Sequence, residues 1–292
     1  MRPDETGIDL PAAWERAIAH ILGHGGGRVV VLGAVDTGKS TFCRALMAAA
    51  ARAGCTHELV DTDPGQKMVG PPATLTRSRL DAPDCLARLA FVGTPSAAEA
   101  LKGVRRALPG LLKHNRASLT VVNTSGLLGG RGRALKASVI DAVHPQLIVA
   151  LGDDPALDAI LQGHARFPVL RLAASPHARR RGRGERRRAR IEAFRRYLAT
   201  AETRELTLGR LRVAGHQTLS RRQLVGLIDR RREEAMGVVE GVTKTGRARV
   251  LTPASAGDIG LIRPGALWLS EAFEERREPP GDDPASGPGS RP

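Results

Sequence analysis

The sequence predicts an α/β protein: a parallel sheet with helices on both faces, followed by a small β-rich C-terminal domain. Short β-branched runs alternate with helix-forming segments through the first two thirds of the chain. A glycine-rich turn separates the first of these runs from the helix that follows it. Beyond Thr203 the helical pattern stops, and short apolar runs separated by Gly and Asp replace it.

The elements of the α/β part follow in order. A first helix is expected from Ala12 to Leu22, before three consecutive glycines. Buried parallel strands appear as continuous runs of Val, Ile and Leu, and such runs cover 28–32, 58–61, 89–92, 119–122, 147–151 and 168–172. Helices are expected between them at 39–53, at 97–114 with a break at Pro109-Gly110, and at 134–143. This alternation is typical of βαβ units.

An arginine-rich stretch then leads into a helix that ends near Leu198. Residues 179–196 hold ten Arg and two Glu, a pattern that on its own also fits a solvated basic face. Strands are expected at 224–228, 238–242 and 248–251, and the β-rich part ends near Trp268. The expected organisation is a helix and linker at 1–27, an α/β domain at 28–202, a β-rich domain at 203–270 and a disordered tail at 271–292.

Composition narrows the functional classes. The chain carries 45 Lys and Arg against 30 Asp and Glu, a net charge of +15 that favours polyanionic partners such as nucleic acid. No apolar run approaches the roughly 18 residues of a membrane span, so no membrane segment is expected. Cys43, Cys55 and Cys85 show no paired spacing, which argues against a disulfide framework or a zinc ribbon and favours a reducing cytoplasm.

The glycine-rich turn has the Walker A pattern G-x-x-x-x-G-K-[ST]. It follows a strand and opens a helix, the context in which backbone N–H groups and a helix N-terminus bind phosphates. In this pattern Lys39 contacts the β- and γ-phosphates and Ser40 holds magnesium. The expected nucleotide-binding residues are Gly33, Ala34, Val35, Asp36, Thr37, Gly38, Lys39, Ser40 and Thr41.

Acidic side chains follow the second strand. Asp61 and Asp63 lie at its carboxyl end, where a parallel sheet opens toward its ligands, and Gln66 follows three residues after Asp63. One carboxylate can orient magnesium and the other can accept a proton from an attacking hydroxyl. Gln66 can position a water or the nucleophile.

Four motifs in this order resemble the polynucleotide 5′-hydroxyl kinase family, which includes the kinase subunit of the pre-mRNA cleavage machinery and the pre-ribosomal RNA processing kinase. They are the Walker A motif with Asp36 inside it, Asp63-Pro-Gly-Gln66, Asn123-Thr-Ser-Gly126, and the arginine-rich helix that ends at Tyr197-Leu198. The resemblance covers roughly residues 28–200 and is nearest to archaeal and bacterial members. It implies that residues 28–202 form a P-loop kinase domain whose lid lies at 179–198.

The resemblance also implies an activity and residue roles. It implies an enzyme that uses ATP and Mg²⁺ to phosphorylate the 5′-hydroxyl of RNA or DNA, with RNA favoured. Lys39 then orients the phosphates, Ser40 ligates magnesium, and Asp63 is the general base and a second metal contact. The implied lid arginines, which close over the triphosphate, are Arg181, Arg186 and Arg190. The implied substrate-side residues are Asp61, Gln66, Asn123 and Thr124.

The chain departs from the family where a polynucleotide is gripped. Leu127 stands where eukaryotic relatives have Trp, and Thr94 and Ser96 are the only remnants of a Thr/Asn clasp. Two other classes therefore stay open. One is an ATP-binding scaffold of an RNA-processing complex that transfers no phosphate, and the other is a P-loop NTPase that acts on a protein or metal centre.

Overall fold

Five parallel strands form one end of the sheet. The computed structural model describes residues 10–113, 116–216, 218–229, 234–254 and 259–279. These parallel strands, in spatial order, are β2 (His57–Asp61), β5 (Leu119–Asn123), β1 (Gly27–Gly33), β6 (Leu147–Leu151) and β7 (Val169–Leu172), and β7 is the edge strand. Val30 of β1 pairs with Val122 on one side and with Ile148 on the other, both in parallel register. The predicted parallel core is confirmed.

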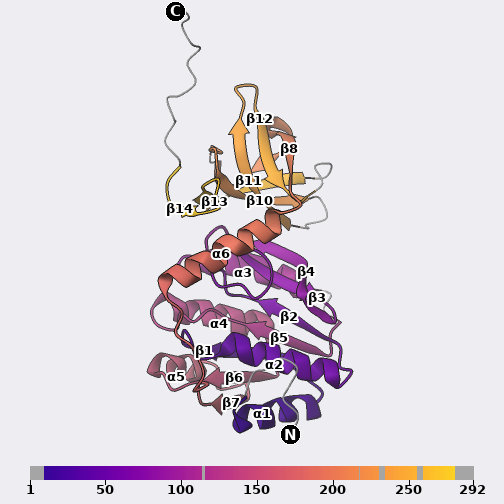
Figure 1. The fold of residues 1–292 in the computed structure, drawn as a ribbon, viewed down its shortest axis with the longest axis vertical. Helices are drawn as coiled ribbons and strands as arrows, with labels where there is room; N and C mark the ends of the chain where they lie inside the picture. The colour runs from indigo at the N-terminus through magenta and orange to yellow at the C-terminus, as the bar shows by residue number, and fades with distance from the viewer. Residues whose placement is uncertain (1–9, 114–115, 217, 230–233, 255–258, 280–292) are drawn as a thin grey trace, which may run out of the picture.

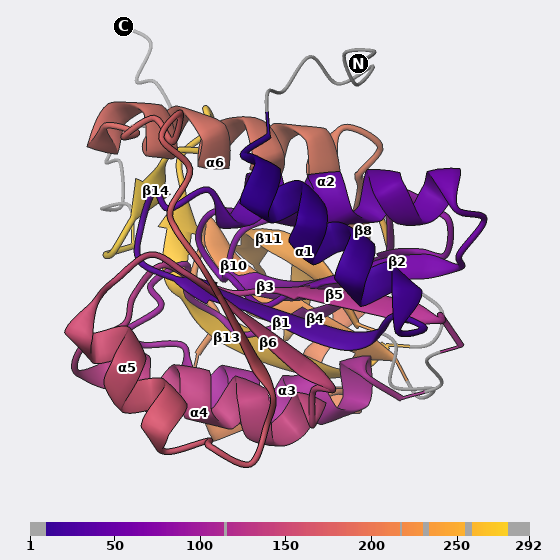
Figure 2. The same cartoon turned by 90° about the horizontal axis from the view of Figure 1, so that it is seen from below.

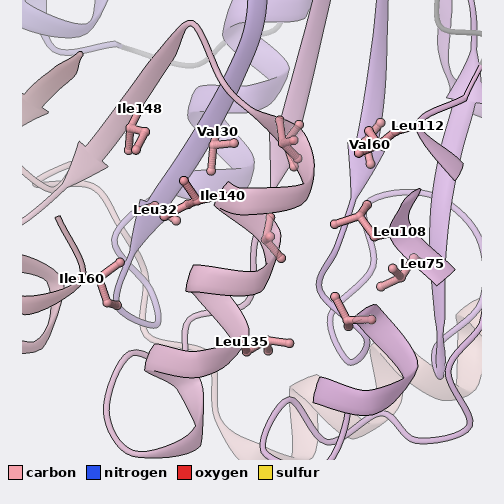
Figure 3. Packing of buried hydrophobic residues seen from close by; sticks show 14 of the residues in the cluster. Val30, Leu32, Val60, Leu75, Leu108, Leu112, Leu135, Ile140, Ile148 and Ile160 are labelled. Atoms are coloured by element: carbon pink, nitrogen blue, oxygen red, sulfur yellow. The ribbon is translucent and has the colours of Figure 1, made fainter. Parts of the chain in front are cut away.

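Helices cover both faces of this sheet (Figure 2). Val29 and Val31 of β1 pack toward α1 (Ala12–Gly23) and α2 (Lys39–Arg52). Val30 and Leu32 pack toward the opposite layer (Figure 3). That layer consists of α3 (Leu101–Leu111), α4 (Arg131–Val143) and α5 (Pro155–Gln162). Successive side chains of β1 alternate between the two helical layers. Because both faces of the strand are buried in this way, the strand is apolar throughout.

The sheet continues with two strands that are antiparallel, unlike the parallel strand expected at 89–92. β3 (Thr74–Arg79) and β4 (Ala82–Phe91) form a hairpin beside β2. The connection is only two residues long, with Asp81 in a left-handed conformation at φ +59°, and so short a link can join only antiparallel strands. The polar residues of β3 hide this strand from a search for apolar runs.

The C-terminal part is a mainly antiparallel sheet above the α/β layers (Figure 1). Its strands are β8 (Glu202–Thr207), β9 (Arg212–Val213), β10 (Gln223–Asp229), β11 (Glu234–Val242), β12 (Arg247–Thr252), β13 (Ile259–Leu269) and β14 (Glu275–Arg276). It joins the rest of the sheet where Glu234 pairs with Leu89 and accepts a hydrogen bond from the Phe91 N–H at 2.7 Å. Because β14 pairs with β13, residues 271–279 differ from the expected disordered tail, and 280–292 lie outside the described residues.

Helix α6 (Arg183–Leu198) crosses between the two parts of the molecule (Figure 1). Phe194 and Leu198 at its C-terminal end are buried in the cluster that also holds Phe91 and Met236. The Tyr197 hydroxyl accepts a hydrogen bond from the Met236 N–H at 3.0 Å. The β-rich part therefore holds one end of α6, while the other end lies over the glycine-rich loop.

Candidate active site

The glycine-rich loop joins β1 to α2 and is fixed by a close approach. Gly38 has φ +92°, and a Cβ there would lie 2.7 Å from Cη2 of Trp14. Trp14 is itself held, because its indole N–H donates to the Ala173 carbonyl at 3.1 Å. Glycine readily adopts this positive φ and has no Cβ to collide with Trp14, so only glycine fits at this position. The first N–H groups of α2, beginning at Lys39, therefore point into the cleft as donors for an anion.

A second close approach fixes the loop from the β5 side. A Cβ on Gly126 would lie 2.7 Å from the Val35 backbone nitrogen. This explains in physical terms why glycine ends the Asn123–Gly126 motif. The motif lies directly against the phosphate loop, and the Thr124 hydroxyl strengthens the contact by donating to the Val31 carbonyl at 2.8 Å.

Lys39 lies inside the loop, with 8% of its surface exposed. Its ammonium donates to the Ala34 carbonyl at 2.5 Å, a contact that keeps the side chain folded over the loop. Burial lowers the pKa of Lys39, and the nearby carboxylate of Asp63 works in the opposite direction. The site thus pairs a partly desolvated cation with an acidic side chain.

The two aspartates after β2 have different environments. Asp61 is fully buried and accepts hydrogen bonds from the Asn123 amide at 3.0 Å and from the Met68 N–H at 2.7 Å. Lys67 lies 3.4 Å from its carboxylate. These contacts tie β2, β5 and the following loop together, and Asp61 does not line the cleft.

Asp63 lines the cleft instead. Its Oδ1 accepts the N–H groups of Gly65 at 2.8 Å and Gln66 at 3.1 Å, and these bonds orient the carboxylate. Removal from water raises the pKa of Asp63, and the negative charge of Asp61 adds to the increase. An oriented, partly desolvated carboxylate is a suitable proton acceptor.

Arginines of the 179–190 segment reach the loop through Asp36. The Arg186 guanidinium lies 2.7 Å from Oδ2 of Asp36, and the Arg181 N–H donates to the same oxygen at 3.2 Å. Arg190, one turn further along α6, points elsewhere and forms a two-pronged pair with Glu275 at 2.6 and 2.7 Å. Arg181 and Arg186 thus lie at the cleft, and Arg190 lies outside its lining.

Together these elements enclose a cleft of about 740 Å³. Residues expected from the sequence that line it are Val35, Asp36, Gly38, Lys39, Ser40, Thr41, Asp63, Gln66, Asn123, Thr124, Arg181 and Arg186. Expected residues outside the lining are Gly33, Ala34, Thr37, Asp61 and Arg190. Gly33, Ala34 and Thr37 belong to the loop itself and fix its shape. The Thr37 hydroxyl, for example, donates a hydrogen bond to the Ala34 carbonyl at 3.0 Å.

Sequence reasoning missed two cations here. Arg44 lies one turn after Ser40 on the same face of α2, a spacing that could have revealed it. Lys136 of α4 is 1% exposed, and its ammonium donates to the Ser125 hydroxyl at 2.7 Å. Burial lowers the pKa of Lys136 to about 7, against the opposing effect of Asp63. Lys136 lies three, four and seven residues before Val139, Ile140 and Val143, on the apolar face of α4, and this spacing could have revealed a buried lysine.

The donors in the cleft are compatible with magnesium. Among the described residues, no group of three His, Cys, Asp or Glu side chains could hold a metal ion. Mg²⁺ bound with a nucleotide needs no such group, because phosphates and waters supply most of its oxygen ligands. Ser40 and Asp63, both in the cleft lining, are hard oxygen donors that fit the remaining positions.

This fold and this cleft define a P-loop nucleotide-binding protein of the α/β class. The family described as mRNA cleavage and polyadenylation factor CLP1 P-loop matches residues 33–200, more than half of the chain. The chain belongs to this family. Membership implies the use of ATP, and it confirms the family resemblance inferred from the four motifs.

The curated relatives that the chain matches include archaeal proteins. A polyribonucleotide 5′-hydroxyl-kinase of Pyrococcus furiosus is 33% identical over 218 residues, which are 71% of this chain and 61% of the relative. One of Pyrococcus abyssi is 31% identical over 198 residues, 64% of this chain and 55% of the relative. The chain therefore spans about three fifths of the length of the relatives it matches.

Solved structures share the fold. A structure described as a wild-type Clp1p–Pcf11p complex superposes with a TM-score of 0.68 at 11% identity and covers 87% of this chain and 79% of the other. At this identity the likeness supports the fold alone. Separately, the described part of the chain has no helix that is both long and apolar enough to cross a membrane.

Proposed function

We propose that this protein is an ATP- and Mg²⁺-dependent kinase that transfers the γ-phosphate to the 5′-hydroxyl of a polynucleotide, with RNA favoured. The observation that carries the proposal is the cleft itself, which gathers Lys39, Asp63 and Arg186 from three distant parts of the chain. The names of the archaeal relatives support the same reaction and a polyribonucleotide acceptor.

The cationic side of the cleft stabilises the transferring phosphoryl group. Lys39 and the N-terminal amides of α2 face the phosphates, where positive charge is most useful in a transition state with little covalent character. Magnesium, when bound with ATP, neutralises charge on the phosphate oxygens. Arg186 and Arg181 approach from α6 and from the segment before it, and they complete the positive environment around the γ-phosphate.

Asp63 acts on the acceptor. Its carboxylate is oriented by two backbone N–H groups, so it can accept a hydrogen bond from the 5′-hydroxyl and then take its proton. Asn123 and Thr124 line the same side of the cleft, at the end of the neighbouring strand β5. The acceptor therefore enters on the β2–β5 side of the loop, and most of the catalytic effect comes from positioning.

The test is a γ-phosphate transfer assay with Mg²⁺ and 5′-hydroxyl RNA or DNA, each offered as single strand and duplex. Wild type should give labelled product, and Lys39→Ala and Asp63→Asn should lose it. Lys102→Ala and Asp84→Asn are matched controls, because both side chains are exposed on α3 and β4. A protein that binds ATP yet labels no 5′-hydroxyl acceptor would refute the kinase proposal and favour the scaffold.

A further inference from the structure

A second, smaller cavity adjoins the cleft. It has a volume of about 70 Å³ and lies between α2, the loop after β2 and helix α6. The two cavities share Ser40, Arg44, Gln66 and Arg181 in their linings, so the smaller one opens directly off the larger. Nothing in the kinase reaction described above uses it.

The lining of this cavity is cationic. Four basic side chains and no acidic side chain line it among the described residues. Two of them are neutralised from outside, since Arg190 pairs with Glu275 and Lys67 lies beside Asp61. Within the described part of the chain, the guanidinium groups of Arg44 and Arg181 make no hydrogen bond or ion pair. The charge of Arg181 also acts on the Glu185 carboxylate, so it is the charge of Arg44 in particular that favours an anion in this cavity.

The size and the position of the cavity limit which anion it can hold. Its volume of about 70 Å³ is about a tenth of the 740 Å³ of the cleft, which suits a single phosphate group rather than a second nucleotide. Gly65 and Gln66, whose N–H groups hold Asp63, also form part of its wall. The cavity therefore lies on the acceptor side of the phosphoryl-transfer position.

We propose that this cavity binds the first internucleotide phosphate of the acceptor strand and that Arg44 is its main contact. The inference rests on the proposed kinase function and adds a specificity determinant to it. An acceptor whose 5′-hydroxyl lies at Asp63 has its next phosphate one nucleoside away, and the cavity, whose wall includes the Gly65 and Gln66 that hold Asp63, lies on the side where that phosphate can bind. Arg44 thereby selects a polynucleotide over a free nucleoside, because a nucleoside leaves the guanidinium unpaired.

The test combines a protein variant with a change in the acceptor. Arg44→Met keeps the length of the side chain and removes its charge, and Arg16→Met, exposed on α1 outside both cavities, is the control. The acceptors are a 5′-hydroxyl RNA, the same RNA with a neutral methylphosphonate at its first linkage, and one with it at the sixth. Acceptor KM, ATP KM and fluorescence-anisotropy binding of the RNA without nucleotide are measured for each pair.

Loss of a charge-assisted contact should raise the acceptor KM of Arg44→Met about tenfold or more, with the ATP KM unchanged. The first-linkage methylphosphonate should cost wild type a similar factor and Arg44→Met almost nothing, while the sixth-linkage substitution costs both little. The slope of log affinity against log salt should fall by about 0.7 in Arg44→Met.

Two results would contradict the inference about Arg44 and would leave the proposed kinase function unaffected. One is an equal methylphosphonate penalty in wild type and Arg44→Met, and the other is an effect of Arg44→Met confined to the ATP KM. Absence of transfer by wild type to any 5′-hydroxyl acceptor is a different result, because it would refute the proposed function itself.

Discussion

The contact between Asp36 and Arg186 holds the arginine-rich segment against the phosphate loop, and Asp36→Asn should loosen it. Asn is the appropriate replacement because Asp36 has φ +59°, a conformation that Asn tolerates, so the backbone of the loop is preserved. The substitution removes the charge that faces the Arg186 guanidinium at 2.7 Å.

The size of the effect of Asp36→Asn follows from the charge and the exposure of the two side chains. A charge-assisted hydrogen bond contributes about 1.5–3 kcal/mol, and solvent weakens this one because the Asp36 and Arg186 side chains are 19% and 28% exposed. We therefore expect the closed position of the segment to lose about 1–2 kcal/mol, a factor of about 5–30 in its opening equilibrium.

Hydrogen exchange measured by mass spectrometry reports this equilibrium directly. Amides of residues 179–190 should exchange about 5–30 times faster in Asp36→Asn, while those of β1, β5 and β6 keep their wild-type rates. A change below twofold in this segment would refute the reasoning, as would an equal acceleration in the central strands, which would indicate global destabilisation.

Three further predictions concern stability. Gly38→Ala should destabilise the protein by about 1–3 kcal/mol in chemical denaturation and weaken ATP binding, because its Cβ meets Trp14 at φ +92°; unchanged values would contradict the fixed loop. Glu275→Gln should lower Tm in calorimetry, because it removes the negative charge that pairs with the partly buried Arg190 guanidinium; an equal Tm would indicate a solvated pair. Lys136 has a pKa of about 7 when folded and 10.5 as its ordinary value, so the unfolded chain binds more protons between these pH values. Relative to Lys136→Met, wild type should therefore gain stability as pH rises from 7 to 10, and parallel pH profiles in urea would contradict the buried cation.

The fold could be predicted wherever one physical requirement governs a segment. The continuous apolar run of β1 follows from burial on both faces, and the glycine-rich turn follows from the tight approach of Gly38 to Trp14. Only the end of β4 was expected, as a parallel strand, because the threonines and arginines of β3 form no apolar pattern. The short connection at Asp81 is what indicates an antiparallel pair.

The residues of the candidate site could likewise be predicted only in part. Position along the chain gave the residues of the cleft, since strand ends in a parallel sheet meet at one edge. It did not separate Asp61 from Asp63, because their difference lies in the Asn123 and Met68 groups that fold around Asp61. Nor did it indicate that Arg190 turns toward Glu275, which lies 85 residues further along the chain.

The most direct test of the central claim is the position of the transferred phosphate. Wild type is incubated with ATP labelled in the γ-phosphate and a 5′-hydroxyl RNA, and the product is digested to nucleotides. We predict that the label lies only on the 5′-oxygen of the first nucleotide, that RNA already phosphorylated there accepts none, and that Asp63→Asn abolishes labelling. Label recovered only as inorganic phosphate, or transfer that persists in Asp63→Asn, would contradict the account.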